Sequence, residues 1–390
     1  MENRPHNFPR LRALITTLVF LLITGVSAAE TVRVATYNVS LGRKGPGLLL
    51  KDLMSGEDAQ IASLVTIIQH IRPDILLLNE FDHDHQNLAL TAFRDALAHG
   101  DNGIDYTYSF APAGNEGRPS FLDLDGDGKA GEWADALGFG KFPGSEGMAL
   151  LSRYPIDTEN ARSFTKLLWS EIPDAQFPKN TDGSDYLLPE ISSVIPFSHK
   201  SHWDIPVDID GTQLNILASH ATPPVFDGAE NINGLRNFAE VWFWVTYLNG
   251  TVYTDDAGKT AVGDTQNFVL LGDLNVDPKD GEGFREPIDA LLNHPRINDP
   301  HQTSLGAAEL DRYSGGANMT QLGQPIYDTV EWDDDIGNMR VDYALPSTGL
   351  RVIDSGVFWP VFDAPFTEIL GEGREGASNH HMVWVDVLIE

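Results

Sequence analysis

Residues 268–275 read FVLLGDLN, a short apolar run that ends in Asp273 and Asn275. Apolar runs of this length, bounded by Gly, Pro or Asp, are typical of β-strands that are buried on both faces. A lone Asp at a strand end is more often a hydrogen-bonded structural residue than a catalytic one. The stretch therefore has to be interpreted together with the other strand ends of the chain.

Two earlier apolar runs also end in polar residues. Val32–Tyr37 leads into Asn38, and Ile75–Asn79 leads into Glu80. A carboxylate at the end of a buried strand is costly unless another group pairs with it, and a hard cation is its natural partner. Three later signatures have the same character, and they are LASH at residues 217–220, RVDY at 340–343 and SNHH at 378–381.

The chain alternates strand-like runs with helix-like segments, which indicates a mixed α/β domain. Ile61–Ile71 and Gly234–Leu248 have the apolar spacing of amphipathic helices. Regions 99–146, 170–200 and 300–340 are rich in Gly, Asp, Pro and Asn, which predicts long surface loops. We expect one domain over residues 30–390, and its predicted strands are Val32–Tyr37, Ile75–Asn79, Met148–Ser152, Leu214–Ser219, Phe268–Gly272, Val341–Leu345 and Met382–Ile389.

Residues 1–29 have the pattern of an export signal. Three arginines precede an apolar stretch, Ala13–Val26, that is too short to span a bilayer, and small residues follow at Ser27–Ala29. An uncleaved anchor is the alternative. Because the chain has 0 cysteines, it has no disulfides. We therefore expect a bacterial protein that is periplasmic or secreted, without stable membrane insertion, and monomeric.

The formal net charge is −31 at pH 7. A surface this acidic repels polyphosphate backbones at long range, so it disfavours tight binding to long nucleic acids unless bound cations or a local basic groove offset it. High solubility is the simpler interpretation of the charge.

Taken together and in this order, the strand-end motifs resemble the endonuclease/exonuclease/phosphatase family. The resemblance runs from about Val32 to the C-terminus. Its strongest elements are Glu80, the GDLN of residues 272–275, and Asp342 combined with Ser378-x-His380. It implies a deoxyribonuclease I-like α/β fold, a four-layer sandwich of two packed β-sheets flanked by helices.

The resemblance implies a role for each of these residues. Glu80, with Asn38 nearby, is expected to bind Mg²⁺ or Mn²⁺. Asp273 is expected to orient or deprotonate the attacking water, and Asn275 to donate to a non-bridging phosphoryl oxygen. Asn379 is a further candidate metal ligand through its amide oxygen. It departs from the family pattern, which usually has aspartate there, and because an amide contributes no charge this puts a tightly held second metal or a shared metal site in doubt.

The resemblance also implies two imidazole–carboxylate pairs that flank the phosphate. Asp342 is expected to fix the tautomer of His380 and to raise its basicity. His220 is expected to pair with Glu146, which opens the EGMALLSR segment of residues 146–153.

Arg236 and His202 lie where family members often place phosphate or specificity contacts, and Arg236 is a candidate phosphate clamp. The alternative for the segment around His202 is packing by Trp203 and a turn at Asp204.

Residues 123–132 read DLDGDGKAGE, which matches the opening half of a calcium loop. Acidic residues alternate and Gly128 provides a sharp turn, but the closing glutamate of an EF-hand is replaced by Ala134. Glu132 or Asp135 is expected to complete the shell. A solvated acidic turn is the alternative, and the predicted calcium-loop residues are Asp123, Asp125, Asp127, Lys129 and Glu132.

These observations predict a metal-dependent phosphoric ester hydrolase that hydrolyses a phosphodiester or phosphomonoester by metal-assisted water attack. The alternatives are an extracellular nuclease that acts on DNA or RNA, and a catalytically inert binding protein on the same fold.

Overall fold

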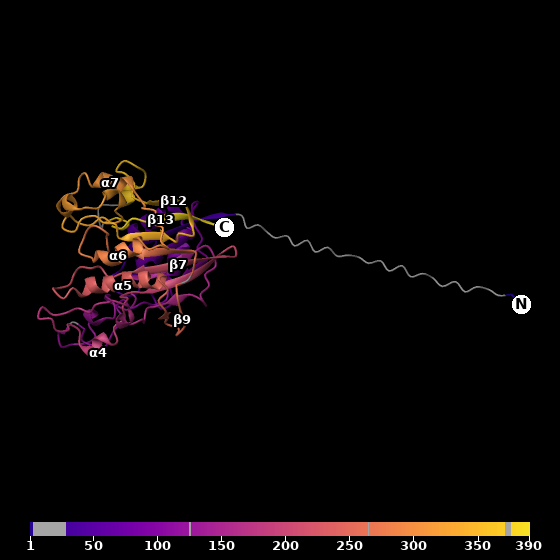
Figure 1. Ribbon diagram of the computed structural model, residues 1–390. Coiled ribbons are helices and arrows are strands. Elements are labelled where there is room, and N and C mark those ends of the chain that lie inside the picture. Colours follow the sequence, from indigo (N-terminus) through magenta and orange to yellow (C-terminus); the bar gives the residue numbers. More distant parts are fainter. Residues whose placement is uncertain (3–28, 125, 264, 371–375) are drawn as a thin grey trace.

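The computed structural model describes residues 1–2, 29–124, 126–263, 265–370 and 376–390, so most of the predicted export segment lies outside the described residues. Two β-sheets dominate the architecture (Figure 1). The six-stranded sheet has the order β12 (Arg351–Val357), β13 (Val383–Ile389), β1 (Glu30–Leu41), β2 (Ile75–Phe81), β4 (Gly147–Ser152), β3 (Tyr108–Phe110). The five-stranded sheet has the order β11 (Asp342–Pro346), β10 (Phe268–Asp273), β7 (Thr212–His220), β6 (His202–Ile209), β5 (Arg162–Ser163).

Helices cover the outer faces of both sheets. The longer ones are α2 (Ala59–Ile71), α3 (Leu88–Ala98) and α5 (Ile232–Leu248), and Figure 1 shows α5 beside α6 (Arg285–Leu292). Shorter elements complete the described chain: α1 (Leu48–Ser55), α4 (Pro189–Ser192), α7 (Leu305–Leu310), α8 (Thr367–Leu370), the hairpin β8 (Tyr253–Thr254) and β9 (Thr260–Ala261), and the 3₁₀ turns Trp133–Asp135, Trp169–Glu171, Gly316–Thr320 and Pro325–Tyr327.

Side chains that point alternately to the two faces of each strand produce the layers of the fold. On β10, Val269 and Leu271 belong to the core between the sheets, whereas Phe268 and Leu270 belong to a second core under α5 and α6. Successive side chains of a strand point to opposite faces, so one fully apolar strand supplies both cores. The result is the predicted sandwich of helices, sheet, sheet and helices.

The helices begin and end where local chemistry dictates. Asp58 caps α2 by accepting a hydrogen bond from the backbone N–H of Ile61 at 2.9 Å, and the helix ends at Arg72, which is left-handed at φ 55°. The following Pro73 disfavours continuation of the helix. None of the described helices is long and apolar enough to cross a membrane.

Two parallel strand pairs bring the polar strand ends together. β1 runs parallel to β2, and β7 runs parallel to β10. In the register of the second sheet, Asp273 lies opposite His220 on one side and opposite Asp342 on the other. The sheets thus present their polar ends at one edge of the sandwich.

Candidate active site

The polar strand ends open into a cleft of about 1170 Å³. Its lining includes most of the predicted catalytic and metal-binding residues, namely Glu80, Glu146, His220, Asp273, Asn275, Asn379 and His380. Asn38 and Asp342 contact these residues from below. The cleft therefore unites side chains that lie up to three hundred residues apart in sequence.

Asp273 is the centre of the group. Its Oδ2 accepts a hydrogen bond from Nδ2 of Asn38 at 3.1 Å and lies 3.5 Å from Nε2 of His220 and 3.8 Å from Nδ1 of His380. Its Oδ1 accepts the backbone N–H of Asn275 at 2.9 Å. Both oxygens of the carboxylate thus have defined neighbours.

Glycine is required immediately before this aspartate. Gly272 has φ 151°, and a Cβ built there would lie 1.9 Å from the backbone oxygen of Ser219. The close approach of β10 to β7 therefore depends on the missing side chain, and that approach sets Asp273 beside His220.

The surroundings raise the pKa of Asp273 to about 7. Burial is the main cause, followed by the charge of Asp342, with a smaller contribution from Glu80. The charge of His380 and the hydrogen bond from Asn38 act in the opposite direction. A carboxylate with this pKa can exchange a proton near neutral pH.

His380 forms the predicted pair with Asp342. Its Nδ1 donates to Oδ2 of Asp342 at 2.8 Å, and the same oxygen accepts from Oγ1 of Thr329 at 2.9 Å. Burial lowers the pKa of His380, but the charges of Asp342 and Asp273 outweigh it and raise the pKa to about 9. The ring is therefore an imidazolium at neutral pH, with Nε2 on its opposite edge.

The backbone of the last motif is also fixed. Oγ of Ser378 donates to the backbone oxygen of Asn38 at 2.7 Å and accepts the backbone N–H of His380 at 3.1 Å. One hydroxyl thus sets the position of His380 relative to the end of β1.

The donor set at the floor suits a hard divalent cation. Asp273, Asp342 and His380 offer ligand atoms within 4.8 Å of one another, and Oδ1 of Asp342 is buried without a hydrogen-bond partner. The charge of Glu80 also acts on this group. Carboxylate oxygens that crowd a buried site favour a cation, so Oδ1 of Asp342 and the carboxylate of Glu80 fit a bound metal.

Comparison with known proteins identifies the family. A model of the endonuclease/exonuclease/phosphatase family matches residues 35–378. The chain belongs to this family. No curated protein matches the chain.

Solved structures that are similar to the chain include other members of the family. An endonuclease/exonuclease/phosphatase from Beutenbergia cavernae is 16% identical, with 92% of this chain and 71% of that chain covered and a TM-score of 0.49. A mannosyl-6-phosphatase of Bacteroides thetaiotaomicron is 13% identical, with 92% and 100% covered and a TM-score of 0.46. Sphingomyelinase C of Streptomyces griseocarneus is 14% identical, with 92% and 99% covered and a TM-score of 0.45.

The predicted pairing of Glu146 with His220 is not formed in this family member. Nδ1 of His220 is buried without a hydrogen-bond partner, and its Nε2 faces Asp273 at 3.5 Å. Glu146, left-handed at φ 59°, donates its backbone N–H to Asp82 and lines the cleft separately. Burial lowers the pKa of His220 well below its ordinary value, so the ring is neutral. Asp273 takes the place that sequence interpretation gave to Glu146.

Asn275 and Asn379 line the cleft as predicted. Nδ2 of Asn275 donates to the backbone oxygen of Ala221 at 3.0 Å, which orients the amide and leaves its second N–H available. Oδ1 of Asn379 accepts only a long hydrogen bond, 3.5 Å, from Oγ of Ser40.

The substrate contacts predicted for Arg236 and His202 are wrong. Arg236 is buried and donates to the backbone oxygens of Phe197, Leu137 and Pro196 at 3.0, 2.7 and 3.0 Å. His202 is fully buried, with Nδ1 2.9 Å from Oγ of Ser198 and Nε2 3.1 Å from the backbone oxygen of Glu240. Neither residue lines the cleft.

The predicted calcium loop is partly described. Asp123 accepts the backbone N–H groups of Gly126 and Gly128 at 2.8 and 2.9 Å. Nζ of Lys129 pairs with Asp127 at 2.8 Å and with Glu132 at 3.4 Å. Asp125 lies outside the described residues, so calcium binding stays a prediction.

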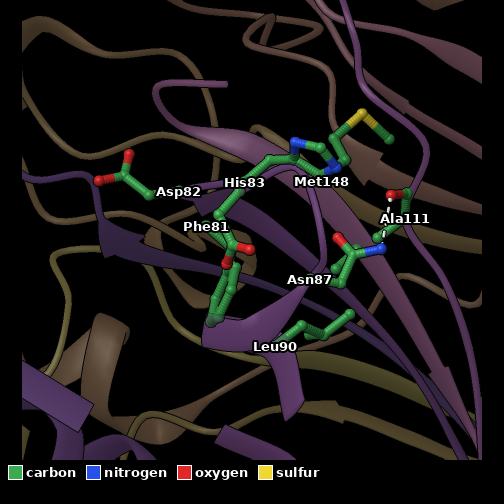
Figure 2. Close-up of a pocket in the computed structure, with 9 residues that line it drawn as sticks. Phe81, Asp82, His83, Asn87, Leu90, Ala111 and Met148 are labelled. Carbon is green, nitrogen blue, oxygen red and sulfur yellow. Dashed lines mark hydrogen bonds between the residues drawn. The ribbon is translucent and has the colours of Figure 1, made fainter. Parts of the chain in front are cut away.

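Sequence interpretation missed a carboxylate that organises two turns of the cleft. Asp82 borders a small hollow behind β2, and Figure 2 shows its side chain pointing away from that hollow. Its two oxygens accept the backbone N–H groups of Arg43 and Glu146, both at 2.8 Å. Asp82 thereby ties both turns to the strand that carries Glu80. The sequence feature that could have predicted this role is the position of Asp82, two residues after Glu80.

A second missed group is the buried pair of Glu240 and His199. Oε1 of Glu240 lies 3.2 Å from Nδ1 of His199, and its Oε2 accepts the backbone N–H of Thr222 at 2.6 Å. His199 lines the cleft next to His220, with ring centroids 5.7 Å apart. The sequence feature that could have predicted this pair is Glu240, a carboxylate among the apolar residues of α5.

Proposed function

We propose that this protein is an exported, divalent-metal-dependent phosphoesterase that hydrolyses a phosphodiester or a phosphomonoester by attack of water. Family membership supports phosphoester hydrolysis in general. The observation that carries the proposal is the position of Asp273, which lies between Asn38, His220 and the His380–Asp342 pair at the floor of the cleft.

Asp273 is the base in this proposal. Its pKa of about 7 matches the working range of a group that accepts a proton from water at neutral pH. Asn38 and the backbone of Asn275 hold the carboxylate in place through both oxygens. The attacking water would therefore be aligned before the reaction begins.

His380 and Asn275 stabilise the charge that develops on the phosphoryl oxygens. In the imidazolium of His380, Nδ1–H donates to Asp342, so the Nε2 proton is available to a phosphoryl oxygen. Asn275 contributes its second amide N–H. Glu80, Asn38 and the unpartnered Oδ1 of Asp342 would hold a metal ion, which when bound would polarise the phosphoryl group and offset its charge.

The charge of the cleft supports substrates other than long nucleic acids. Its lining has more acidic side chains than lysines and arginines, and the acidic ones are Glu80, Glu146, Asp273, Asp277, Asp280, Glu282 and Asp335. Such a lining repels a polyanionic backbone beyond the reacting phosphate. Small phosphate esters and phospholipid head groups lack this penalty.

A hydrolysis panel tests the function. The purified protein without residues 1–29 is incubated with a simple phosphodiester, a phosphomonoester, DNA and sphingomyelin, with chelator or with Mg²⁺ or Mn²⁺. We expect metal-dependent hydrolysis of at least one non-nucleic ester and little action on DNA. Hydrolysis that is unchanged by chelation would refute the metal assignment, and a lack of hydrolysis throughout would favour an inert binding protein.

The pattern of residues 1–29 supports export. Expression of the full chain in a bacterial host, followed by mass spectrometry of the periplasmic fraction, should give a chain that begins near Ala29 or Glu30. Retention of the intact N-terminus in the membrane fraction would contradict the proposal.

A further inference from the structure

Apart from histidines, the described cleft lining contains two basic side chains, Arg43 and Lys200. Arg43 is already neutralised, because its Nε lies 2.9 Å from Asp52 and its Nη2 lies 3.2 Å from Asp58. Its Nη1 donates to Gln60 at 3.2 Å. Arg43 therefore serves the structure of the cleft wall and has little capacity left for a ligand.

Lys200 has no such partner. It is only 3% exposed, yet no carboxylate among the described residues forms an ion pair with its ammonium. Nζ makes one hydrogen bond, to the backbone oxygen of Glu146 at 2.6 Å. An ammonium has three N–H donors, so two remain. A buried charge without a counter-ion is costly, which calls for an anion that arrives from outside.

The position of Lys200 matches that of a phosphate ligand. It lies just before β6 in the five-stranded sheet, and its bond to Glu146 reaches the start of β4 in the six-stranded sheet. It therefore bridges the two sheets at the edge where the catalytic residues gather. Its charge also lowers the pKa of His220, after the larger effect of burial, so Lys200 is close to the wall that carries His220.

The carboxylate that Lys200 does influence is a weak partner. Burial raises the pKa of Glu116 to about 7, although the charge of Lys200 acts to lower it. Glu116 is 2% exposed and lies under Gly147, where its Oε1 would meet an added Cβ at 2.9 Å. Among the described residues Glu116 forms no ion pair with Lys200, so it offsets the charge of the ammonium only in part.

We propose that Lys200 binds the non-bridging oxygens of the substrate phosphate, which places that phosphate between Lys200 on one wall and His380 on the other. This inference rests on the proposed phosphoesterase function. A lysine acts as a compact point charge toward phosphate, and its two remaining N–H donors are enough for two oxygens. One uncompensated cation in an otherwise acidic cleft suits a substrate with a single phosphate group.

The test compares Lys200→Met, Lys200→Arg and the control Lys166→Met. Lys166 is exposed and outside the cleft, so the control changes the net charge equally. Binding of inorganic phosphate is measured by calorimetry with Mg²⁺ present, and kcat/KM is measured on the best ester of the hydrolysis panel. We expect Lys200→Met to weaken phosphate binding at least tenfold and to lower kcat/KM about a hundredfold, which corresponds to about 2.7 kcal/mol. Lys200→Arg should retain part of the phosphate affinity and part of kcat/KM, and Lys166→Met should match the wild type in both.

Three outcomes separate the possible failures. Wild-type phosphate affinity in a folded Lys200→Met protein overturns the proposal, as does a wild type that binds no phosphate at millimolar concentration. Phosphate binding that depends on Lys200 without hydrolysis of any ester supports the phosphate site and refutes the proposed phosphoesterase function. A lower melting temperature in both Lys200 variants with unchanged phosphate affinity would show that the hydrogen bond from Lys200 to Glu146 serves stability alone.

Discussion

His380 and His202 are both buried histidines in the same sandwich, yet they carry opposite charge states. Burial lowers the pKa of His380, but the carboxylates of Asp342 and Asp273 raise it to about 9. His202 has a hydroxyl and a backbone carbonyl as its hydrogen-bond partners, and burial lowers its pKa to about 4. Burial alone therefore favours neutral histidine, and adjacent carboxylates are needed to keep an imidazolium.

The comparison separates two kinds of buried polar region. The floor of the cleft concentrates charge, because three carboxylates and one imidazolium meet at the strand ends. The described region under α5 has no such cluster of charges, because Arg236 and His202 form hydrogen bonds mainly with backbone oxygens and a hydroxyl. The first arrangement is suited to proton transfer and to metal binding, and the second to stability.

Removing the central carboxylate should have the largest effect. Asp273→Asn keeps the shape of the side chain but removes the base, so we expect the hydrolysis rate to fall by roughly 10³-fold or more. Asp335→Asn removes the same charge from an exposed position on the cleft lining and should stay within about threefold of the wild type. Steady-state kinetics of both variants decides, and a fully active Asp273→Asn enzyme would exclude Asp273 from the mechanism.

The two histidines should change the pH dependence of stability in opposite directions. The unfolded pKa of His380 is 6.5 and its folded pKa is about 9, so its contribution is complete below pH 6.5 and is lost as pH rises through 9. The folded pKa of His202 is about 4, so its contribution is present above pH 6.5 and is lost as pH falls toward 4. Each change amounts to roughly 3 kcal/mol at 1.36 kcal/mol per pKa unit.

Denaturant unfolding between pH 4 and pH 9.5 measures both contributions. His380→Gln should flatten the alkaline part of the stability profile, and His202→Gln should flatten the acid part. Each variant is the matched control for the other, because the substitution is the same. An acid slope in His202→Gln equal to that of the wild type would show that His202 is not the group that titrates there.

Arg236 should be a stability residue with little effect on catalysis. Arg236→Met removes the donor from three backbone oxygens, two of them in buried hydrogen bonds, which should cost about 3 kcal/mol and lower the melting temperature. Measured well below the melting temperature, kcat/KM should remain within about threefold of the wild type. A selective loss of kcat/KM without loss of stability would restore the original prediction of a phosphate clamp.

Local patterns predicted the strands and their polar ends correctly. Residues such as Asp273 and Glu80 follow apolar runs, and parallel pairing brings the carboxyl ends of such runs to one edge. Arg236 and His202 were misplaced because their orientation depends on helix and strand phase. Arg236 lies one turn before Glu240 on the buried face of α5, and His202 faces away from the core that contains Trp203. Lys200 gave no local signal, because its neighbours Glu116, Glu146 and His220 are distant from it in the sequence.

The calcium loop should show the smallest effect. In this acidic segment Asp127, Lys129 and Glu132 are exposed, unlike the floor of the cleft, and Lys129 already partly neutralises the two carboxylates. Ca²⁺ has to compete with this ammonium, so millimolar Ca²⁺ should raise the melting temperature by only a few degrees, against the roughly 2.7 kcal/mol that a hundredfold excess over Kd provides in full. Lys129→Met should enlarge the rise, and Asp125→Asn combined with Asp127→Asn should abolish most of it, while Mg²⁺-dependent hydrolysis is retained. Differential scanning calorimetry of the three proteins gives the answer, and an equal Ca²⁺ response in the double variant would exclude this loop as the site.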